Sequence, residues 1–504
     1  MDPDVPGKFK SLWIDTTPDT NYPTLKKNLE VDVVVIGGGI VGLTTALFLK
    51  AEGLKVAVIE RDRVSKGVTG HTTAKITSQH GIIYDYLISS FGVDKAEAYA
   101  QASEAAIDQI ELITRKLKID CDFIRKPAYV FAECPEDLDI IKKEVEAAKS
   151  LGLPASFIED LPTPVESFGV VKFENQAQFH PRKYLLKIAD TIPGEGSFIF
   201  ENTTALSFKE GEPCEVETDK GEIRAKDIVV ASHVPFFKNP GAFFTRLYLI
   251  RSYVYGIYIK GKIPEGMFYG TGTHTFRSQA TKKGTIMLMG GEDHKAGQGG
   301  DITARYKRLA EFYKEKFEVE EIDYHWSTQD PDTPDRVPFI GLVSPDSKHV
   351  YMASGFHGWG MTNGTVAAML ISDMITGKEN LWRELYDPSR VTIKASVGRF
   401  LTENVNVAKE FVKGKMQKME EIDIEKLKKG EGRIGLVQGE TLGIYKDDQG
   451  KVYAVVPECT FEGCDLVWNN AEKTWDCPCC GSRFYFDGKV MQGPATKDLE
   501  KAKL

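Results

Sequence analysis

The residues of this chain best suited to chemistry are cysteines that gather near its C-terminal end. Five of the eight cysteines lie between residues 459 and 480, in the segments Cys459-Thr-Phe-Glu-Gly-Cys464 and Cys477-Pro-Cys-Cys480. Thiolates at such short spacing bind zinc or iron, whereas disulfides are rare in reducing compartments. Three interpretations stay open for this site, namely an iron–sulfur cluster, a zinc ion or a domain without a metal.

A second chemical motif is a glycine-rich turn near the N-terminus, where Gly37, Gly39 and Gly42 fit the pattern G-x-G-x-x-G. A β-branched run precedes the turn at 31–36, and a run of helical spacing follows it. In such a unit the glycines permit a tight turn, close approach of a pyrophosphate and close packing of helix on strand. Glu60 ends the next apolar run, where a carboxylate accepts hydrogen bonds from ribose hydroxyls. The spacing therefore predicts a βαβ unit that binds a dinucleotide.

Two further segments are rich in glycine and small polar residues. The first spans 67–81 and follows directly on Glu60, and the second spans 351–364 and precedes an apolar helix at 365–375. Glycines before a helix N-terminus suit a buried anionic group or an electron-rich ring edge, because the free N–H groups point toward it.

These features together resemble the flavoenzymes of the D-amino-acid oxidase and glycine oxidase type, over about residues 30–380. The resemblance implies an FAD cofactor and an α/β fold, with a Rossmann-like FAD-binding lobe and a split β-sheet substrate lobe. It places 67–81 beside the pyrophosphate and isoalloxazine, and 351–364 at the pyrimidine side of the flavin. The implied cofactor-binding residues are Gly37, Gly39, Gly42, Glu60, Thr72, Thr73, Gly355, Gly358, Gly360 and Met361. His71 and His357 lie inside these segments and are the implied catalytic candidates.

One position departs from the amine-oxidising members of this family, which commonly place an arginine before the proline of a Pro-x-Thr-Pro-Asp segment. Here the residue before Pro331 is Asp330. In the family that arginine holds the carboxylate of an amino-acid substrate, and a carboxylate in its place would repel such a substrate. The departure argues against plain amino-acid oxidation.

The C-terminal segments resemble a Rieske domain, with the motifs C-T-x-x-G-C, W-D-C-P-C-x-G-S-R-F and D-G-x-V-x-x-G-P-A. This resemblance implies a small all-β domain and a [2Fe–2S] cluster, for which each loop supplies one cysteine and one histidine. Cys459 and Cys477 stand at the thiolate positions, whereas Phe461 and Cys480 stand where the histidines belong.

The implied ligand set is therefore rich in thiolates. Cys459, Cys477 and Cys480 line the site, and Cys464 would be a fourth ligand if it turned inward. The resemblance also implies an alternative, in which Cys464 and Cys479 form the disulfide that links the two loops in some Rieske proteins. A cluster with thiolates in place of imidazoles would have a lower reduction potential.

Composition and length limit the remaining alternatives. The net charge of −9 provides no basic excess for nucleic acid, and no apolar run approaches the ~20 residues that span a bilayer. The N-terminus has no basic-then-apolar signal region, so the sequence predicts a cytoplasmic protein. We predict an oxidoreductase domain at 1–390, a helical linker at 391–427 and a Rieske-like domain at 428–504.

These expectations combine into an FAD-dependent oxidoreductase that oxidises an amine or a related small donor. Its electrons would pass to the C-terminal iron–sulfur-like centre, and from there to an acceptor such as a redox protein. The alternative is a flavin electron-transfer or redox-sensing protein with no amine substrate, whose C-terminal domain is degenerate or binds zinc. The sequence predicts neither the identity of the substrate nor the oligomeric state.

Overall fold

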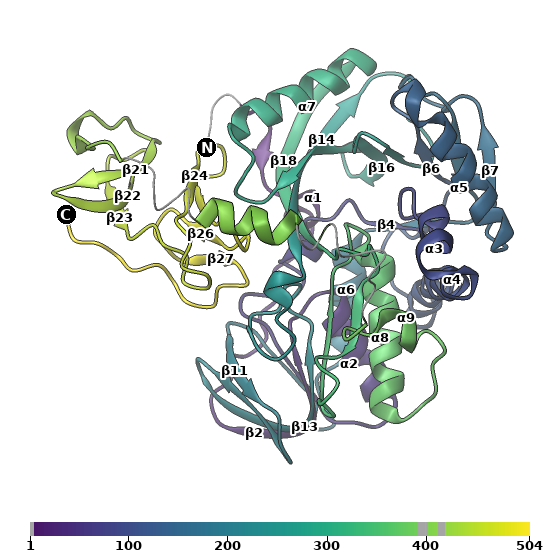
Figure 1. Cartoon of the computed structure of the whole chain (residues 1–504), viewed down its shortest axis with the longest axis horizontal. Coiled ribbons are helices and arrows are strands. Elements are labelled where there is room, and N and C mark those ends of the chain that lie inside the picture. The colour runs from purple at the N-terminus through teal and green to yellow at the C-terminus, as the bar shows by residue number, and fades with distance from the viewer. Residues whose placement is uncertain (1–4, 391–398, 400–401, 412–418) are drawn as a thin grey trace.

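The computed structural model describes residues 5–390, 399, 402–411 and 419–504. Figure 1 shows two large lobes that share most of the chain and a smaller C-terminal domain beside them. Residues 402–411 of the predicted linker are helical, and the rest of 391–418 except residue 399 lies outside the described residues. The predicted domain boundaries stay predictions.

The first lobe, the Rossmann-like lobe, is built on a mostly parallel sheet whose central strands are buried on both faces, as runs of valine and isoleucine predict. The glycine turn leads from β2 (Leu29–Ile36) into α2 (Ile40–Ala51), and α8 (Gly360–Thr376) packs beside α2. β20 (Val350–Ser354) pairs with β13 (Gly221–Val230) and with β19 (Phe339–Leu342). The strand order is β10 (Phe198–Phe200), β3 (Val56–Ile59), β2 (Leu29–Ile36), β13 (Gly221–Val230), β12 (Cys214–Thr218) and β11 (Ala205–Lys209).

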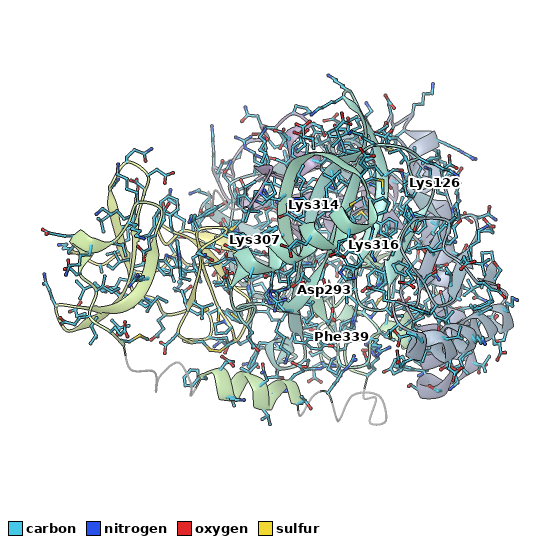
Figure 2. All side chains as sticks on the ribbon, turned by 90° about the horizontal axis from the view of Figure 1, so that it is seen from above. Lys126, Asp293, Lys307, Lys314, Lys316 and Phe339 are labelled. Carbon is cyan, nitrogen blue, oxygen red and sulfur yellow. A yellow bond between two sulfur atoms is a disulfide. The ribbon has the colours of Figure 1, made fainter. Side chains whose placement is uncertain are left out.

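The second lobe, the large-sheet lobe, carries one long mixed sheet. Its strand order is β1 (Lys8–Phe9), β18 (Val319–Asp332), β14 (Tyr248–Ile259), β17 (Gly284–Lys295), β16 (Thr275–Thr281), β15 (Met267–Gly270), β6 (Ala128–Phe131), β8 (Val170–Phe173) and β7 (Ala155–Ile158). α7 (Ile302–Lys316) covers one face, with Tyr306, Leu309 and Tyr313 buried against the sheet. Figure 2 labels Lys307, Lys314 and Lys316 on this helix. The apolar face of α7 therefore packs on the sheet.

Shorter elements surround the two lobes. A small sheet of β4 (Lys75–Ile76), β9 (Ala177–Gln178) and β5 (Ile124–Arg125) brings Lys75 close to the large sheet. The other helices are α1 (Leu12–Asp15), α3 (Tyr84–Phe91), α4 (Val93–Lys116), α5 (Leu138–Ser150), α6 (Pro181–Thr191) and α9 (Arg383–Tyr386), with single 3-10 turns at Val68–Gly70, Pro135–Asp137, Phe243–Thr245 and Ile424–Lys426.

The C-terminal domain is made of two small antiparallel sheets. The first contains β21 (Gly432–Val437), β22 (Glu440–Lys446) and β23 (Val452–Val455), and the second contains β24 (Val467–Asn469), β25 (Thr474–Asp476), β26 (Arg483–Tyr485) and β27 (Val490–Gln492). The cysteine loops precede β24 and β26, and Figure 1 shows the second sheet on the side that faces the two lobes. The predicted α/β fold with an all-β C-terminal domain is confirmed.

Candidate functional site

A cavity of about 450 Å³ opens at the carboxyl edge of the Rossmann-like sheet and continues under the large sheet. The ends of β2, β3 and β13 meet at this edge because the three strands are parallel and in register, with Ile36 opposite both Ile59 and Val230. Ligands of open α/β sheets bind in this place. The C-terminal domain closes part of the cavity with Arg483, Tyr485 and residues 491–496.

The glycine turn is packed so closely against neighbouring backbone that two of its positions have no room for a side chain. Gly37 has φ +117°, and a Cβ at this residue would lie 2.4 Å from the Ala231 carbonyl oxygen. A Cβ at Gly42 would lie 1.9 Å from the Gly37 carbonyl oxygen, so α2 packs directly on the turn. Gly39 and Ile40 border the cavity at the N-terminus of α2, and the positive end of a helix dipole attracts phosphate. The turn fits a dinucleotide pyrophosphate.

Glu60 is held at the end of β3 by two backbone hydrogen bonds. Its Oε2 accepts from the Gly38 N–H at 2.8 Å, and its Oε1 accepts from the Asp62 N–H at 2.9 Å. Burial raises the pKa of Glu60, and these N–H donors act against that rise. The side chain borders the cavity, so its remaining lone pairs are available to ribose hydroxyls.

The cavity gathers most of the residues that the sequence assigns to the cofactor. Gly42 and Gly355 do not border it. Close packing requires glycine at both positions, and a Cβ at Gly355 would lie 2.4 Å from Thr333 Cγ2. The predicted residues that line the cavity are Gly37, Gly39, Glu60, His71, Thr72, Thr73, His357, Gly358, Gly360 and Met361. Their roles toward FAD stay predictions, and Thr69, whose Oγ1 accepts from the Ile40 N–H at 3.2 Å, is a lining residue that sequence reasoning missed.

The two histidine candidates differ in how their nitrogens are engaged. His71 Nδ1 donates to the Gly67 carbonyl at 2.9 Å, which leaves Nε2 as the acceptor nitrogen, and burial lowers its pKa. His357 Nδ1 lies 3.2 Å from Asp332 Oδ2, and its Nε2 accepts from the Thr333 N–H at 3.0 Å. With both nitrogens engaged, His357 is suited to orient Asp332, and a catalytic role for either histidine stays a prediction.

Three carboxylates border the deep end of the cavity, namely Asp293 at the end of β17 and Asp330 and Asp332 at the end of β18. Desolvation, together with the charge of Asp332, raises the pKa of Asp293 to about 7, and the same two causes raise the pKa of Asp330 to about 7. Figure 2 labels Asp293 in the central part of the molecule. Among the described residues, no ion pair reaches Asp293 or Asp330.

Lys75 also lies in the cavity, but it contacts hydroxyls. Its Nζ donates to Thr275 Oγ1 at 2.5 Å and to Thr73 Oγ1 at 3.1 Å. Burial, and then the charge of Arg277, lowers the pKa of Lys75 to about 7. A partly neutral lysine does not balance three carboxylates, so the deep end of the cavity favours a cation.

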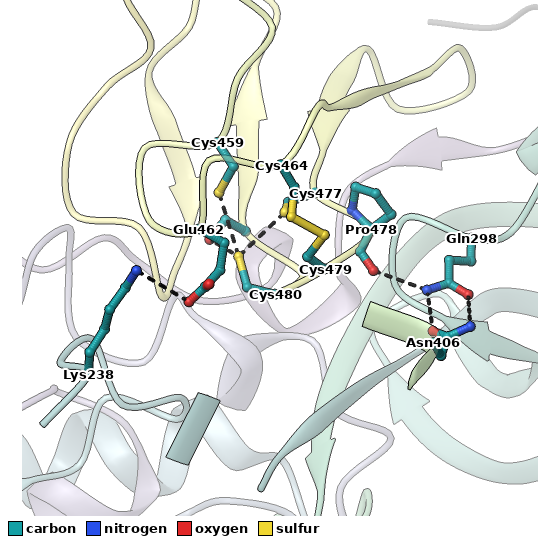
Figure 3. Close-up of a disulfide and its surroundings, with 11 residues drawn as sticks. Lys238, Gln298, Asn406, Cys459, Glu462, Cys464, Cys477, Pro478, Cys479 and Cys480 are labelled. Atoms are coloured by element: carbon teal, nitrogen blue, oxygen red, sulfur yellow. Dashed lines mark hydrogen bonds and ion pairs between the residues drawn. A yellow bond between two sulfur atoms is a disulfide. The ribbon is translucent and has the colours of Figure 1, made fainter. Parts of the chain in front are cut away.

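Three free thiols meet in the C-terminal domain (Figure 3). Cys459 Sγ and Cys480 Sγ are 3.6 Å apart, Cys480 Sγ and Cys477 Sγ are 3.5 Å apart, and all three residues are buried. Cys464 is joined to Cys479 by a disulfide of 2.05 Å. This bond corrects the predicted ligand set, because a sulfur in a disulfide is not a thiolate ligand, and Cys464 drops out of it.

Buried ion pairs fix the C-terminal domain against the large-sheet lobe. Arg251 of β14 lies 3.3 Å from Glu472 and 3.6 Å from Asp476, and Arg483 also pairs with both carboxylates. Burial acts to raise the pKa of Asp476, but Arg483 and Arg251 outweigh it and hold that pKa at about 2. Gln329 Nε2 donates to the Gly481 carbonyl at 2.8 Å beside this network. The domain is therefore docked through a neutralised, water-excluded interface.

Comparisons with known proteins agree with this architecture. The family described as FAD dependent oxidoreductase, or DAO, matches residues 32–374, and the Rieske [2Fe-2S] domain matches residues 417–503. The Bacillus subtilis protein YhfW, whose name describes a Rieske 2Fe-2S iron-sulfur protein, is 38% identical over 498 residues and 98% of both chains. Gamma-glutamylputrescine oxidoreductase of Escherichia coli is 23% identical over 71% of this chain and 86% of its own.

Solved structures show the same fold. The L-amino acid deaminase from Proteus vulgaris matches with a TM-score of 0.60 and 18% identity, over 74% of this chain and 100% of its own. The glycine oxidase from Geobacillus kaustophilus matches with a TM-score of 0.58 and 16% identity, over 72% of this chain and 99% of its own. Among the described helices, none combines the length and apolar character needed to cross a membrane.

Proposed function

Because this chain belongs to the DAO family of FAD-dependent oxidoreductases and carries a Rieske [2Fe–2S] domain, we propose that it oxidises a small donor bearing a cationic amine. FAD dependence and the oxidoreductase class follow from the family. The Rieske match places the C-terminal domain in a family that holds a [2Fe–2S] cluster, which is one of the three interpretations that the sequence leaves open. The observation that carries the proposal about the donor is the group of three carboxylates in the cavity, Asp293, Asp330 and Asp332.

The charge of this group selects among donors. A carboxylate of an amino acid would meet Asp330 in the place where an arginine holds it in amine-oxidising relatives, and like charges repel strongly in a partly dry cavity. An ammonium group instead supplies the missing counter-charge and hydrogen-bond donors. The Escherichia coli relative is named for gamma-glutamylputrescine, which is also an amine, and this supports the assignment.

The chemistry divides between the cofactor and the residues of the cavity. FAD, held by the glycine turn and Glu60, would supply the acceptor for a hydride equivalent from the carbon next to the amine nitrogen. Asp330 and Asp293 hold the charged end of the donor, and Asp332 is kept in place by His357. His71 presents Nε2 as an acceptor and is our proposed acceptor of the amine proton.

The test is anaerobic reduction of the bound flavin by a panel of donors. We expect primary and secondary amines with a second cationic group to bleach the flavin absorbance fastest. Amino acids and hydroxy acids of similar length should react at least about ten-fold more slowly, which corresponds to roughly 1.4 kcal/mol. Preferential reduction by amino acids would contradict the proposal, and a flavin that no donor reduces would favour the electron-transfer alternative.

After the flavin, the electrons need an acceptor. Their transfer to the C-terminal centre and then to a redox protein stays a prediction, as does the cytoplasmic location. The docked interface would keep the two domains in fixed relation during such a transfer. We assign no step to a Rieske cluster, because the domain lacks the histidines of that ligand set.

A further inference from the structure

The C-terminal domain departs from the ligand set of the domain family that it matches. A Rieske cluster uses two cysteines on one iron and two histidines on the other. The sequence contains no histidine after His357, and the two histidine positions are occupied by Phe461 and Cys480. Phe461 packs against the apolar core of the domain, and its ring lies 5.3 Å from Lys238 Nζ. The residues present therefore do not fit a cluster with two imidazole ligands.

The geometry of the thiols fits a different metal centre. Four tetrahedral thiolates around an ion with metal–sulfur bonds of about 2.3 Å have sulfur–sulfur distances of about 3.8 Å. The distances of 3.6 Å between the sulfurs of Cys459 and Cys480, and of 3.5 Å between those of Cys480 and Cys477, are close to this value. If the thiolates bound two different irons, the sulfurs on different irons would lie farther apart than those on one ion. All three sulfurs lie within 4.8 Å of one another, as ligands of one ion do.

The spacing of the second loop supports a single ion. Cys477 and Cys480 form a C-x-x-C pair, which is the spacing of structural zinc sites. The change from histidine to cysteine at position 480 thus creates a ligand pair within one loop, and Cys459 from the other loop completes three corners. In the described part of the chain, no fourth histidine, cysteine, aspartate or glutamate joins this group.

The surroundings of the thiols are already organised for ligation. The backbone N–H groups of Phe461 and Glu462 hydrogen-bond to the Cys459 sulfur, as outer-shell donors do around metal thiolates. The disulfide between Cys464 and Cys479 ties the two loops together, so the sulfurs are held at short distance without a metal. A site that is held in advance loses little entropy when it binds an ion.

We propose that Cys459, Cys477 and Cys480 bind one soft divalent ion of the zinc class, with the fourth corner open to a ligand from solvent. The site lies beside the docked face of the domain, because Gln298 Nε2 donates to the Pro478 carbonyl at 3.0 Å and Gln329 contacts Gly481. The ion therefore braces the loop that contacts the large-sheet lobe. This proposal is independent of the donor that the flavin oxidises.

The first experiment measures the metal of the full-length protein purified without oxygen. We expect one zinc-class ion per chain and no acid-labile sulfide, and Co²⁺ in its place should give the intense absorption of tetrahedral thiolate coordination. Two irons and two sulfides per chain would overturn the proposal. Protein that binds neither Zn²⁺ nor Co²⁺ while its three thiols are reduced would overturn it as well.

Variants of the thiols test the ligand set. Cys480→Ser should weaken Co²⁺ binding by more than about a hundred-fold, since it removes a direct ligand. Cys134→Ser is the matched control, because Cys134 is a free, half-buried cysteine outside the cluster. FAD content should be unchanged in both variants, which separates loss of the ion from loss of folding. Equal Co²⁺ affinity of the Cys480→Ser and Cys134→Ser proteins would overturn the assignment.

A gain of function provides a second readout. The double variant with Phe461→His and Cys480→His restores the Rieske pattern of two cysteines and two histidines. We expect it to take up two irons and two sulfides on anaerobic reconstitution and to show a Rieske-type electron paramagnetic resonance signal, whereas the unaltered chain should not. An identical iron and sulfide content in both proteins would contradict a single-ion site.

Discussion

The domain interface and the cavity both remove carboxylates from bulk water, but they treat the charges in opposite ways. At the interface Glu472 and Asp476 face Arg251 and Arg483, and the pKa of Asp476 falls to about 2 because the arginines outweigh burial. In the cavity the pKa of Asp330 rises to about 7, because burial and the neighbouring Asp332 act together without an arginine.

This difference separates residues that hold the fold from residues that await a ligand. Paired buried charges stabilise a docked interface only while each partner is present. Unpaired carboxylates with raised pKa values cost stability, and such groups are typical of binding and catalytic sites. In our proposal, the donor supplies the cation that these carboxylates lack.

The largest effect is expected at the interface. Arg251→Met removes a buried cation and leaves Glu472 and Asp476 under-compensated, so the free energy of unfolding should fall by about 3–5 kcal/mol. Thermal unfolding followed by circular dichroism measures this loss. Arg433→Met is the control, because Arg433 is exposed where it pairs with the half-buried Glu431, and such a pair should contribute about 0–1 kcal/mol. Equal stability of the two variants would show that the buried ion pairs of Arg251 do not stabilise the interface.

The next effect concerns the cavity. Asp330→Asn keeps the size of the side chain but removes its charge, so kcat/KM for a cationic donor should fall by about 10–100-fold, equivalent to roughly 1.5–3 kcal/mol. Steady-state kinetics with the best amine of the panel measures it. Asp323→Asn lies on the same strand but outside the lining of the cavity, and it should leave kcat/KM unchanged. An Asp330→Asn enzyme as active as the unaltered one would exclude Asp330 from donor binding.

The pH dependence of donor binding tests the carboxylates of the cavity further. Asp293 and Asp330, with pKa values raised to about 7, hold protons below pH 7 and must release them when a cation binds. The Kd of a donor that stays cationic should therefore decrease as pH rises from about 5.5 to about 7, by up to about ten-fold per pH unit for each proton released. It should level off above that range. A Kd that is constant over this window would show that neither group titrates on binding.

The smallest expected effect is a stability change of opposite sign in two variants, Asp293→Asn and Asp476→Asn. Asp293 has a raised pKa, so the folded protein loses stability as pH rises from about 4 to about 7, and Asp293→Asn should increase the free energy of unfolding at pH 8. Asp476 has a lowered pKa, so its stabilisation is present above pH 4 and lost as pH falls toward 2. Asp476→Asn should therefore destabilise at pH 8. Denaturant unfolding of both variants at pH 8 measures the two changes in the free energy of unfolding. Changes in the same direction would contradict the contrast between the cavity and the interface.

Local motifs made the nucleotide half of the site predictable from sequence. Gly37, Gly39 and Glu60 lie within one βαβ unit, so their spacing already determines their geometry. The charge of Asp330 was readable for the same reason, because it sits in a short family motif. Asp293 was missed, since it reaches the cavity from β17, whose place beside β14 depends on long-range strand pairing.

The remaining features depend on contacts between distant segments. Arg251 and Glu472 are far apart in the chain, and no local pattern predicts that they pair across a domain interface. The thiols were recognised from spacing, but the sequence left two fates open for Cys464, as a ligand or in a disulfide. Which sulfurs meet is determined by how the two loops face each other, and only the folded structure shows it.

The most direct test of a cation-selecting cavity compares two ligands that differ at one charged end. Putrescine and 4-aminobutanoate share a four-carbon chain and one amine, but the second end is an ammonium in one and a carboxylate in the other. Their Kd values at pH 8, measured by perturbation of the bound-flavin spectrum without oxygen, should differ by at least about ten-fold in favour of putrescine. Equal affinity, or tighter binding of 4-aminobutanoate, would contradict the assignment of Asp293, Asp330 and Asp332 to a cationic donor.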